Sequence, residues 1–236
     1  MPHFQIKKFF GVLLFWGSTF FLFAGALSGY TDIKQFSTEF FDIIYPPESE
    51  QTAFLLGKHC DKLYAEICTE LGAETDLHLP IVITPGQDSL NAYFTPIPYN
   101  RIVVYDTAVT ASNTVSLTVF EETLLSVLYH ELVHAVSLNM KRGFVKFLGQ
   151  MWGDYLNPAM LQPTSLFTEG VAVALESHKG EGRLNDGFAT QELLQSKIEG
   201  KFPAWRNVSG ARDVFPGGTM PYIFGGAFTR WLRDAY

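Results

Sequence analysis

The pattern of apolar and polar positions divides the chain into short strands and amphipathic helices. Over residues 52–71, apolar residues recur every three or four positions, which predicts one helix. The apolar run Leu79–Thr84, closed by a Pro-Gly pair, predicts a buried strand followed by a turn. Residues 31–50 have a mixed pattern that ends in two prolines, so we expect an entry segment there.

Two further strands are predicted between residues 91 and 105. Asn91–Thr95 and Arg101–Tyr105 flank a proline-rich turn, which is the arrangement of a hairpin. We expect its first arm to be irregular, because Pro96 and Pro98 have no N–H group to donate to a central ladder.

The next apolar stretch predicts a long interior helix. Thr118 with Glu121 matches a capping box at its start, and Lys141, Arg142 and Gly143 supply a basic last turn and a terminal glycine. The residues expected to face the core are Leu124, Leu125, Leu128 and Leu132. A different side of this helix carries Val127, His130, Val133 and His134.

The remaining chain predicts helices separated by one irregular segment. Residues 144–163 are aromatic and punctuated by glycine without a clear period, which suits a lid over a cleft or, as we favour, a separate packing cluster. Helices are predicted at residues 165–177, at 189–199 and from 222 to the end. No internal repeat or low-complexity linker divides the chain.

The first 29 residues have the features of a targeting segment. Lys7 and Lys8 precede an apolar run over residues 9–23, and Ala24-Gly25-Ala26 forms a small-residue cleavage site. We predict a signal peptide at residues 1–26. The alternative is an uncleaved anchor that associates with a membrane through residues 9–29, since about 20 apolar residues span a bilayer. Either case predicts an exported protein, periplasmic or extracellular.

The composition of the chain limits which partners it can bind and whether its two cysteines can form a disulfide. A net charge of -7 and a pI near 5.3, with no run of Lys or Arg, exclude a nucleic-acid surface. Cys60 and Cys68 share one predicted helix. At about 1.5 Å rise per residue they lie about 12 Å apart, beyond the roughly 7 Å that a disulfide bridges. We expect both to be buried as small apolar groups.

Five residues of the long helix have the spacing of a catalytic metal site: His130-Glu131-Leu132-Val133-His134. Positions i and i+4 lie on one face of a helix, so both imidazoles can reach a single ion. Glu131 is close enough to accept a proton from an activated water. Catalytic zinc takes three protein ligands and leaves one position open, so a third ligand is required.

Candidates for the third ligand lie further along the chain. Glu169 belongs to an otherwise apolar helix, where coordination to a cation would offset the cost of burying a carboxylate. The alternative for Glu169 is a first-turn carboxylate interacting with the helix dipole. Glu176, on about the same face, suits a hydrogen bond to an imidazole N–H. His178 and Asp154 have no helical register and are expected in solvated loops.

The motif at 130–134 occurs with three other segments that together resemble gluzincin-type zinc metallopeptidases. These segments are NAYFTPIPYNRIVV at 91–104, FTEGVAV at 167–173 and YIFGGAF at 222–228. More narrowly, residues 50–236 resemble the exported bacterial peptidase-like domains that often precede a TolB-type β-propeller. The resemblance implies His130, His134 and Glu169 as zinc ligands, Glu131 as general base and Tyr222 as a donor to the oxyanion.

The same resemblance implies an α+β fold of the thermolysin-like zincin type. A small mixed sheet would pack on the motif helix, followed by a mainly helical C-terminal part, and residues 27–236 would form this metallopeptidase domain. Asn91, Ala92 and Tyr93 would offer an edge strand to extended peptide, with an ordinary capped edge as the alternative. No propeller repeats follow Tyr236, so we expect a domain truncated at its C-terminus or a stand-alone version.

The expected function is Zn²⁺-dependent hydrolysis of peptide bonds in a peptide or protein substrate. For Tyr222, packing beside Gly225 and Gly226 is the competing interpretation. Two other classes compete with the enzyme. One is a catalytically silent metal-binding or interaction module that retains the peptidase fold, and the other is a membrane-anchored structural protein in which the histidine motif is a coincidence.

Overall fold

The computed structural model describes residues 27, 29–74, 76–96, 99–107, 117–141, 143–152, 164–178, 180–209 and 217–236. The predicted signal peptide, Asp154 and the side chains of the predicted capping box lie outside the described residues. None of the described helices is both long and apolar enough to cross a bilayer.

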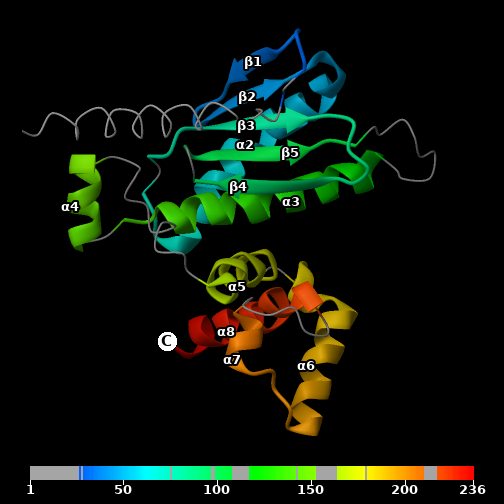
Figure 1. The fold of residues 1–236 in the computed structure, drawn as a ribbon, viewed down its shortest axis with the longest axis vertical. Coiled ribbons are helices and arrows are strands. Elements are labelled where there is room, and N and C mark those ends of the chain that lie inside the picture. The colour runs from blue at the N-terminus through cyan, green and yellow to red at the C-terminus, as the bar shows by residue number, and fades with distance from the viewer. Residues whose placement is uncertain are drawn as a thin grey trace, which may run out of the picture.

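A five-stranded mixed sheet forms one layer of the protein (Figure 1). Its strands are β1 (Lys34–Ser37), β2 (Phe41–Tyr45), β3 (Leu79–Thr84), β4 (Asn91–Thr95) and β5 (Arg101–Tyr105), in the order β1-β2-β3-β5-β4. The three inner strands are parallel, whereas the edge strands β1 and β4 are antiparallel to their neighbours. The α+β class and the hairpin of β4 and β5 are therefore confirmed. The expectation of an irregular first arm is wrong, because β4 pairs in continuous register up to Thr95 and Pro96 lies beyond its end.

The strands β1 and β2 correct the expectation of an entry segment at residues 31–50. Phe41, Ile43 and Tyr45 are buried while Asp42 and Ile44 between them are partly exposed, which is the alternation of a strand with one covered face. A 3-10 turn, η1 (Pro47–Ser49), leads into α2 (Glu50–Leu71). This helix supplies the crossover that the parallel strands β2 and β3 require.

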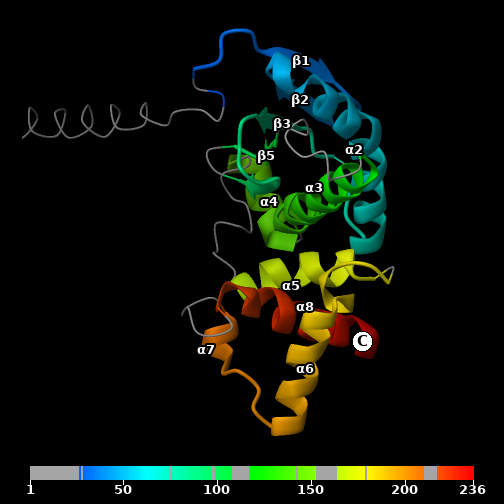
Figure 2. The same cartoon turned by 90° about the vertical axis from the view of Figure 1, so that its right-hand side faces the viewer.

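Helices α2 and α3 (Leu117–Asn139) pack against the sheet and enclose the larger hydrophobic core (Figure 2). Leu124, Leu128 and Leu132 are fully buried, as predicted, whereas Leu125 is only partly buried. Cys60 and Cys68 are free and buried in this core, which confirms that they pack as small apolar groups.

Helix α3 ends at Asn139, before the basic residues expected in its last turn. The Asn139 side-chain amide donates to the carbonyl oxygen of Ala135 at 2.7 Å and exchanges hydrogen bonds with Asn100 at 3.1 and 3.2 Å. These bonds connect the last residue of α3 both to its own last turn and to Asn100, which directly precedes β5. Gly143, at φ 53°, then begins the next helix instead of terminating α3.

Residues Gly143–Trp152 form the helix α4, where the sequence predicted the start of an irregular lid or packing cluster over residues 144–163. Its Phe144, Phe147 and Met151 side chains are exposed and belong to neither hydrophobic core. The prediction of a packing cluster is therefore wrong for this helix.

The C-terminal part is helical, as predicted, and lies below α3 in Figure 1. It comprises α5 (Ser165–Glu176), α6 (Gly187–Glu199), α7 (Trp205–Val208) and α8 (Met220–Ala235), with 3-10 turns η5 (Arg183–Asn185) and η6 (Gly217–Thr219). Asp186 caps α6 by accepting the amide hydrogen of Phe188 at 2.7 Å. The smaller core here consists of Leu166, Ala189, Val208, Met220, Ile223 and Phe224.

Two glycines allow α5 and α8 to approach until their backbones touch. A Cβ on Gly170 would lie 2.6 Å from the carbonyl oxygen of Gly225, and a Cβ on Gly225 would lie 2.5 Å from that of Leu166. Both distances are far inside van der Waals contact, so the packing of this helix pair depends on glycine at both positions. The contact fixes where α5 presents Glu169 relative to the first turn of α8.

We expect Gly225→Ala to destabilise the protein by about 1–3 kcal/mol, because the added methyl group would force α5 and α8 apart. Urea denaturation followed by circular dichroism measures this. Gly187→Ala is the control: nothing lies within 4 Å of its Cβ position, and a helix gains up to about 1 kcal/mol from this change. Equal stability of the two variants would contradict the close backbone contact.

Candidate metal centre

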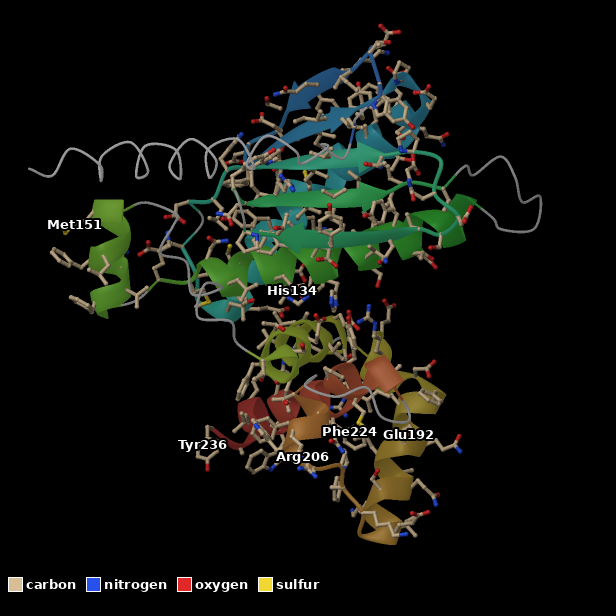
Figure 3. The ribbon with its side chains drawn as sticks, in the orientation of Figure 1. His134, Met151, Glu192, Arg206, Phe224 and Tyr236 are labelled. Carbon is tan, nitrogen blue, oxygen red and sulfur yellow. The ribbon has the colours of Figure 1, made fainter. Side chains whose placement is uncertain are left out.

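Helices α3 and α5 bring the three predicted metal ligands together where the two cores meet. His130 and His134 lie one turn apart on α3, and Glu169 faces them from α5; Figure 3 shows His134 between these two helices. One ligand atom of each residue lies within 4.8 Å of the other two. The group could therefore hold a metal ion.

The spacing of the three ligand atoms suits one small cation. His130 Nε2 lies 3.1 Å from Glu169 Oε2 and 3.2 Å from His134 Nε2, and His134 Nε2 lies 3.4 Å from the same carboxylate oxygen. Tetrahedral zinc with bonds of about 2.0–2.2 Å holds its ligand atoms about 3.3–3.6 Å apart. The triangle of nitrogen and oxygen atoms therefore fits a zinc-sized ion.

The electrostatics of the group also favour a positive charge between the three side chains. Burial opposes the charged form of His130, but hydrogen bonds with Glu169 and Glu176 outweigh it and raise the pKa of His130 to about 9. Burial also opposes ionisation of Glu169, yet hydrogen bonds from His130 and His134 lower the pKa of Glu169 to about 2. A proton or a metal cation can supply the charge that the carboxylate attracts.

Glu176 orients the ring of His130 from the side of Nδ1, the nitrogen that does not face the other ligands. Its Oε2 lies 2.9 Å from His130 Nδ1, which is the hydrogen bond predicted for this residue. Its other oxygen accepts the backbone amide hydrogen of Arg183 at 3.3 Å and lies 3.5 Å from the Arg183 Nε. This chain of contacts turns His130 Nε2 toward Glu169. His134 Nδ1, in contrast, is buried without a hydrogen-bond partner among the residues that the structure describes.

Glu131 is buried beside the ligands and faces the sheet. Its Oε2 accepts the backbone amide hydrogen of Phe94, on the edge strand β4, at 2.7 Å. Burial raises the pKa of Glu131, and the neighbouring His134 and His130 oppose that increase. The carboxylate therefore lies between the metal ligands and the edge of the sheet, with its affinity for a proton increased.

Tyr222, in the first turn of α8, packs against the candidate ligand His130. Its ring stacks on His130 with 6.2 Å between centroids and 27° between planes, and the Arg183 guanidinium lies 4.9 Å from its ring centroid. Burial raises the pKa of Tyr222, and the negative charge of Glu169 adds to this. The residue therefore contacts the candidate site itself, in addition to sharing a helix with the packed glycines.

The structure also tests the alternatives that the sequence left open for Glu169 and His178. Glu169 lies beyond the first turn of α5 and pairs with the histidines, so the helix-dipole alternative is wrong. His178 is exposed, 2.7 Å from an Arg233 nitrogen and outside the ligand group, as expected.

Sequence reasoning missed Arg183 and the Phe94 amide, because neither a residue in a polar loop nor a backbone group has a recognisable pattern.

Comparison with known proteins finds a similar sequence but no matching family model. No protein-family model matches the sequence. An uncharacterized protein of Treponema pallidum (strain Nichols) is 37% identical over 203 residues, which make up 85% of this chain and 17% of the relative. The chain thus spans about a sixth of the length of this relative. The match gives no activity for either protein.

We expect Glu176→Gln to weaken metal binding about tenfold, because an uncharged amide holds the His130 N–H less strongly than a carboxylate. Competition with a chromophoric zinc chelator measures the affinity. Glu192→Gln is the matched control, since this side chain lies on α6, well away from His134 (Figure 3). Unchanged affinity in Glu176→Gln would contradict the orienting role of this residue.

Proposed function

We propose that the chain is a zinc-dependent metallopeptidase of the gluzincin type with a thermolysin-like arrangement. The observation that carries the proposal is the convergence of His130 Nε2, His134 Nε2 and Glu169 Oε2 within 3.1 to 3.4 Å, next to the buried Glu131. Two imidazoles and one carboxylate form the protein ligand set of zinc in thermolysin and carboxypeptidase A. Three protein ligands leave a fourth position for water or substrate.

Zinc held by these residues would supply a Lewis acid that polarises a carbonyl group and makes water nucleophilic at neutral pH. Glu131 is the base in this proposal. It lies next to the ligands in space and is not one of them, and its burial increases its affinity for the proton that an attacking water must lose. The same carboxyl group can return that proton to the departing amine.

Strand β4 supports an extended peptide as the substrate. Its Ala92 and Phe94 amides donate to the side-chain oxygens of Asn91 and Glu131, at 2.9 and 2.7 Å, instead of to a neighbouring strand. Both amides belong to an edge strand beside the candidate base. A peptide that adds to this edge would replace the side-chain acceptors with its own carbonyl groups and bring its backbone to Glu131.

A cavity of about 540 Å³ beside Tyr222 offers room for a substrate side chain. Phe188, Ala189 and Ile223 give its lining an apolar character, and Arg183 and Glu176 contribute charged groups. The targeting segment predicted at residues 1–26 would place this activity outside the cytoplasm.

Two substitutions in the histidine motif separate metal binding from catalysis. We expect Glu131→Gln to keep one bound zinc per chain and to lose peptidase activity by a factor of about 10² to 10⁴, the usual contribution of a general base. His134→Ala should lose both the metal and the activity. Zinc content by mass spectrometry of the purified chain, with cleavage of unfolded casein and a mixed peptide library, measures the two properties.

Zinc content and peptide cleavage, measured on the wild-type chain, decide between the proposal and its alternatives. Absence of bound zinc after purification in its presence would overturn the metal site and the enzyme together. Stoichiometric zinc without cleavage of any peptide or unfolded protein would instead identify a catalytically silent metal-binding module.

Tyr222→Phe tests the proposed donor to the oxyanion. The phenyl ring retains the stacking on His130, so zinc content and thermal stability should match the wild type. Loss of the hydroxyl should lower kcat by about 100-fold or more, as removal of an oxyanion donor does elsewhere. Unchanged kcat would show that Tyr222 only packs against His130.

A further inference from the structure

The turn η5, which carries Arg183, is fixed to the C-terminal end of α5. The Ser177 Oγ accepts the backbone amide hydrogen of Leu184 at 3.1 Å, and the side-chain amide of Asn185 donates to the carbonyl oxygen of Ser177 at 2.8 Å. Ser177 is buried, so these bonds are shielded from water. The position of Arg183 in the chain is therefore set by hydrogen bonds that do not involve its own side chain.

Gly182 brings this turn into contact with Glu176. Its φ of 77° lies in the region that favours glycine, and a Cβ at this position would lie 2.7 Å from the carbonyl oxygen of Glu176. A glycine here therefore permits an approach that a side chain would block. As a result, the backbone amide of the next residue, Arg183, donates to Glu176 Oε1 at 3.3 Å, and the Arg183 Nε lies 3.5 Å from the same oxygen.

The side chain of Arg183 contacts the two residues that touch the ring of His130 from outside the ligand group. Glu176 Oε2 lies 2.9 Å from His130 Nδ1, and the Tyr222 ring stacks on His130 with 6.2 Å between centroids. The Arg183 guanidinium lies 4.9 Å from the Tyr222 ring centroid and pairs with Glu176 through Nε. These four side chains, from α3, α5, η5 and α8, form a closed cycle of contacts, so displacement of any one member breaks two of them.

We propose that Arg183 is a positioning residue that fixes the ring of His130 and the hydroxyl group of Tyr222 relative to each other. Arginine suits this role because its planar guanidinium pairs with a carboxylate and stacks on an aromatic ring at the same time. The compact ammonium group of lysine keeps the charge and lacks the planar group. The inference rests on the proposed function, because the groups that Arg183 fixes are a metal ligand and the donor to the oxyanion in that proposal.

Fluorine NMR of the full chain labelled with 3-fluorotyrosine tests the contact with Tyr222 without metal or substrate. The Tyr222 resonance is the one that Tyr222→Phe removes. We expect Arg183→Met and Arg183→Lys both to shift and narrow this resonance, because the ring loses the planar group that restrains it. Arg206→Met is the matched control. This exposed arginine belongs to α7, and Figure 3 shows it well away from His134, so the resonance should not change.

Zinc affinity separates a positioning role from an effect of charge alone. A positive charge close to the ligands opposes a metal cation, so removal of the charge by itself would strengthen zinc binding. Loss of the position of His130 would weaken it. We expect Arg183→Met to weaken zinc binding by up to about tenfold, and Arg183→Lys, which keeps the charge, at least as much. Added to Glu176→Gln, Arg183→Met should cause little further loss, because both residues act on His130 through one contact.

The rate of peptide cleavage tests the link to the Tyr222 hydroxyl. Arg183→Met should lower kcat about tenfold in the chain that retains Tyr222. In the Tyr222→Phe background the same substitution should leave kcat nearly unchanged, since the group that Arg183 fixes is already absent. Arg206→Met should leave kcat unchanged in both backgrounds.

Three outcomes would overturn the positioning role. The first is an unchanged Tyr222 resonance in both Arg183 variants. The second is tighter zinc binding in Arg183→Met with unchanged binding in Arg183→Lys, which would reduce the role of Arg183 to its charge. The third is an equal loss of kcat with and without the Tyr222 hydroxyl. A wild-type chain that neither binds zinc nor cleaves peptides, while the Arg183 variants shift the Tyr222 resonance, would overturn the proposed function and support the contact.

Discussion

Carboxylates are costly to bury, and this protein places three of them, on Glu131, Glu169 and Glu176, at the junction of its two hydrophobic cores. Each carboxylate is compensated by hydrogen-bond partners that belong to an element other than its own. The Phe94 amide of β4 serves Glu131, the α3 histidines serve Glu169, and His130 and η5 serve Glu176. Because removal of a partner from a buried charge costs about 3–5 kcal/mol, correct assembly of the sheet, α3, α5 and η5 around these groups is linked to the stability of the whole.

Helix α5 links the two halves of the molecule. Its Ala172 and Leu175 belong to the larger core under the sheet, while Leu166 belongs to the smaller core with α8. Glu169 lies between these anchoring positions in the sequence. A helix that is held by both cores has little freedom to rotate or slide, so the carboxylate keeps its position opposite the histidines of α3.

The sequence predicted the parts of the fold and site that depend on local spacing. The long helices have clear periods, the interval of four between the histidines places them on one face, and Glu169 stands out as a carboxylate in an apolar helix. Features that depend on contacts distant in sequence were missed or misread. The strand β2 is too short for its alternation to be distinguished from a mixed segment. Gly143 suits a helix end and a helix start equally, and only the folded chain brings Arg183 and the Phe94 amide to the site.

The glycine contact between α5 and α8 determines which positions can change during evolution without loss of the site. Main-chain atoms set the distance between the two helices, so the apolar side chains of the smaller core can be exchanged for others of similar volume while Glu169 and Tyr222 keep their separation. The glycines themselves have no such freedom, because any side chain at either position changes that distance directly. Relatives of this protein can thus diverge widely around the C-terminal helices and still retain one fixed pair of small residues.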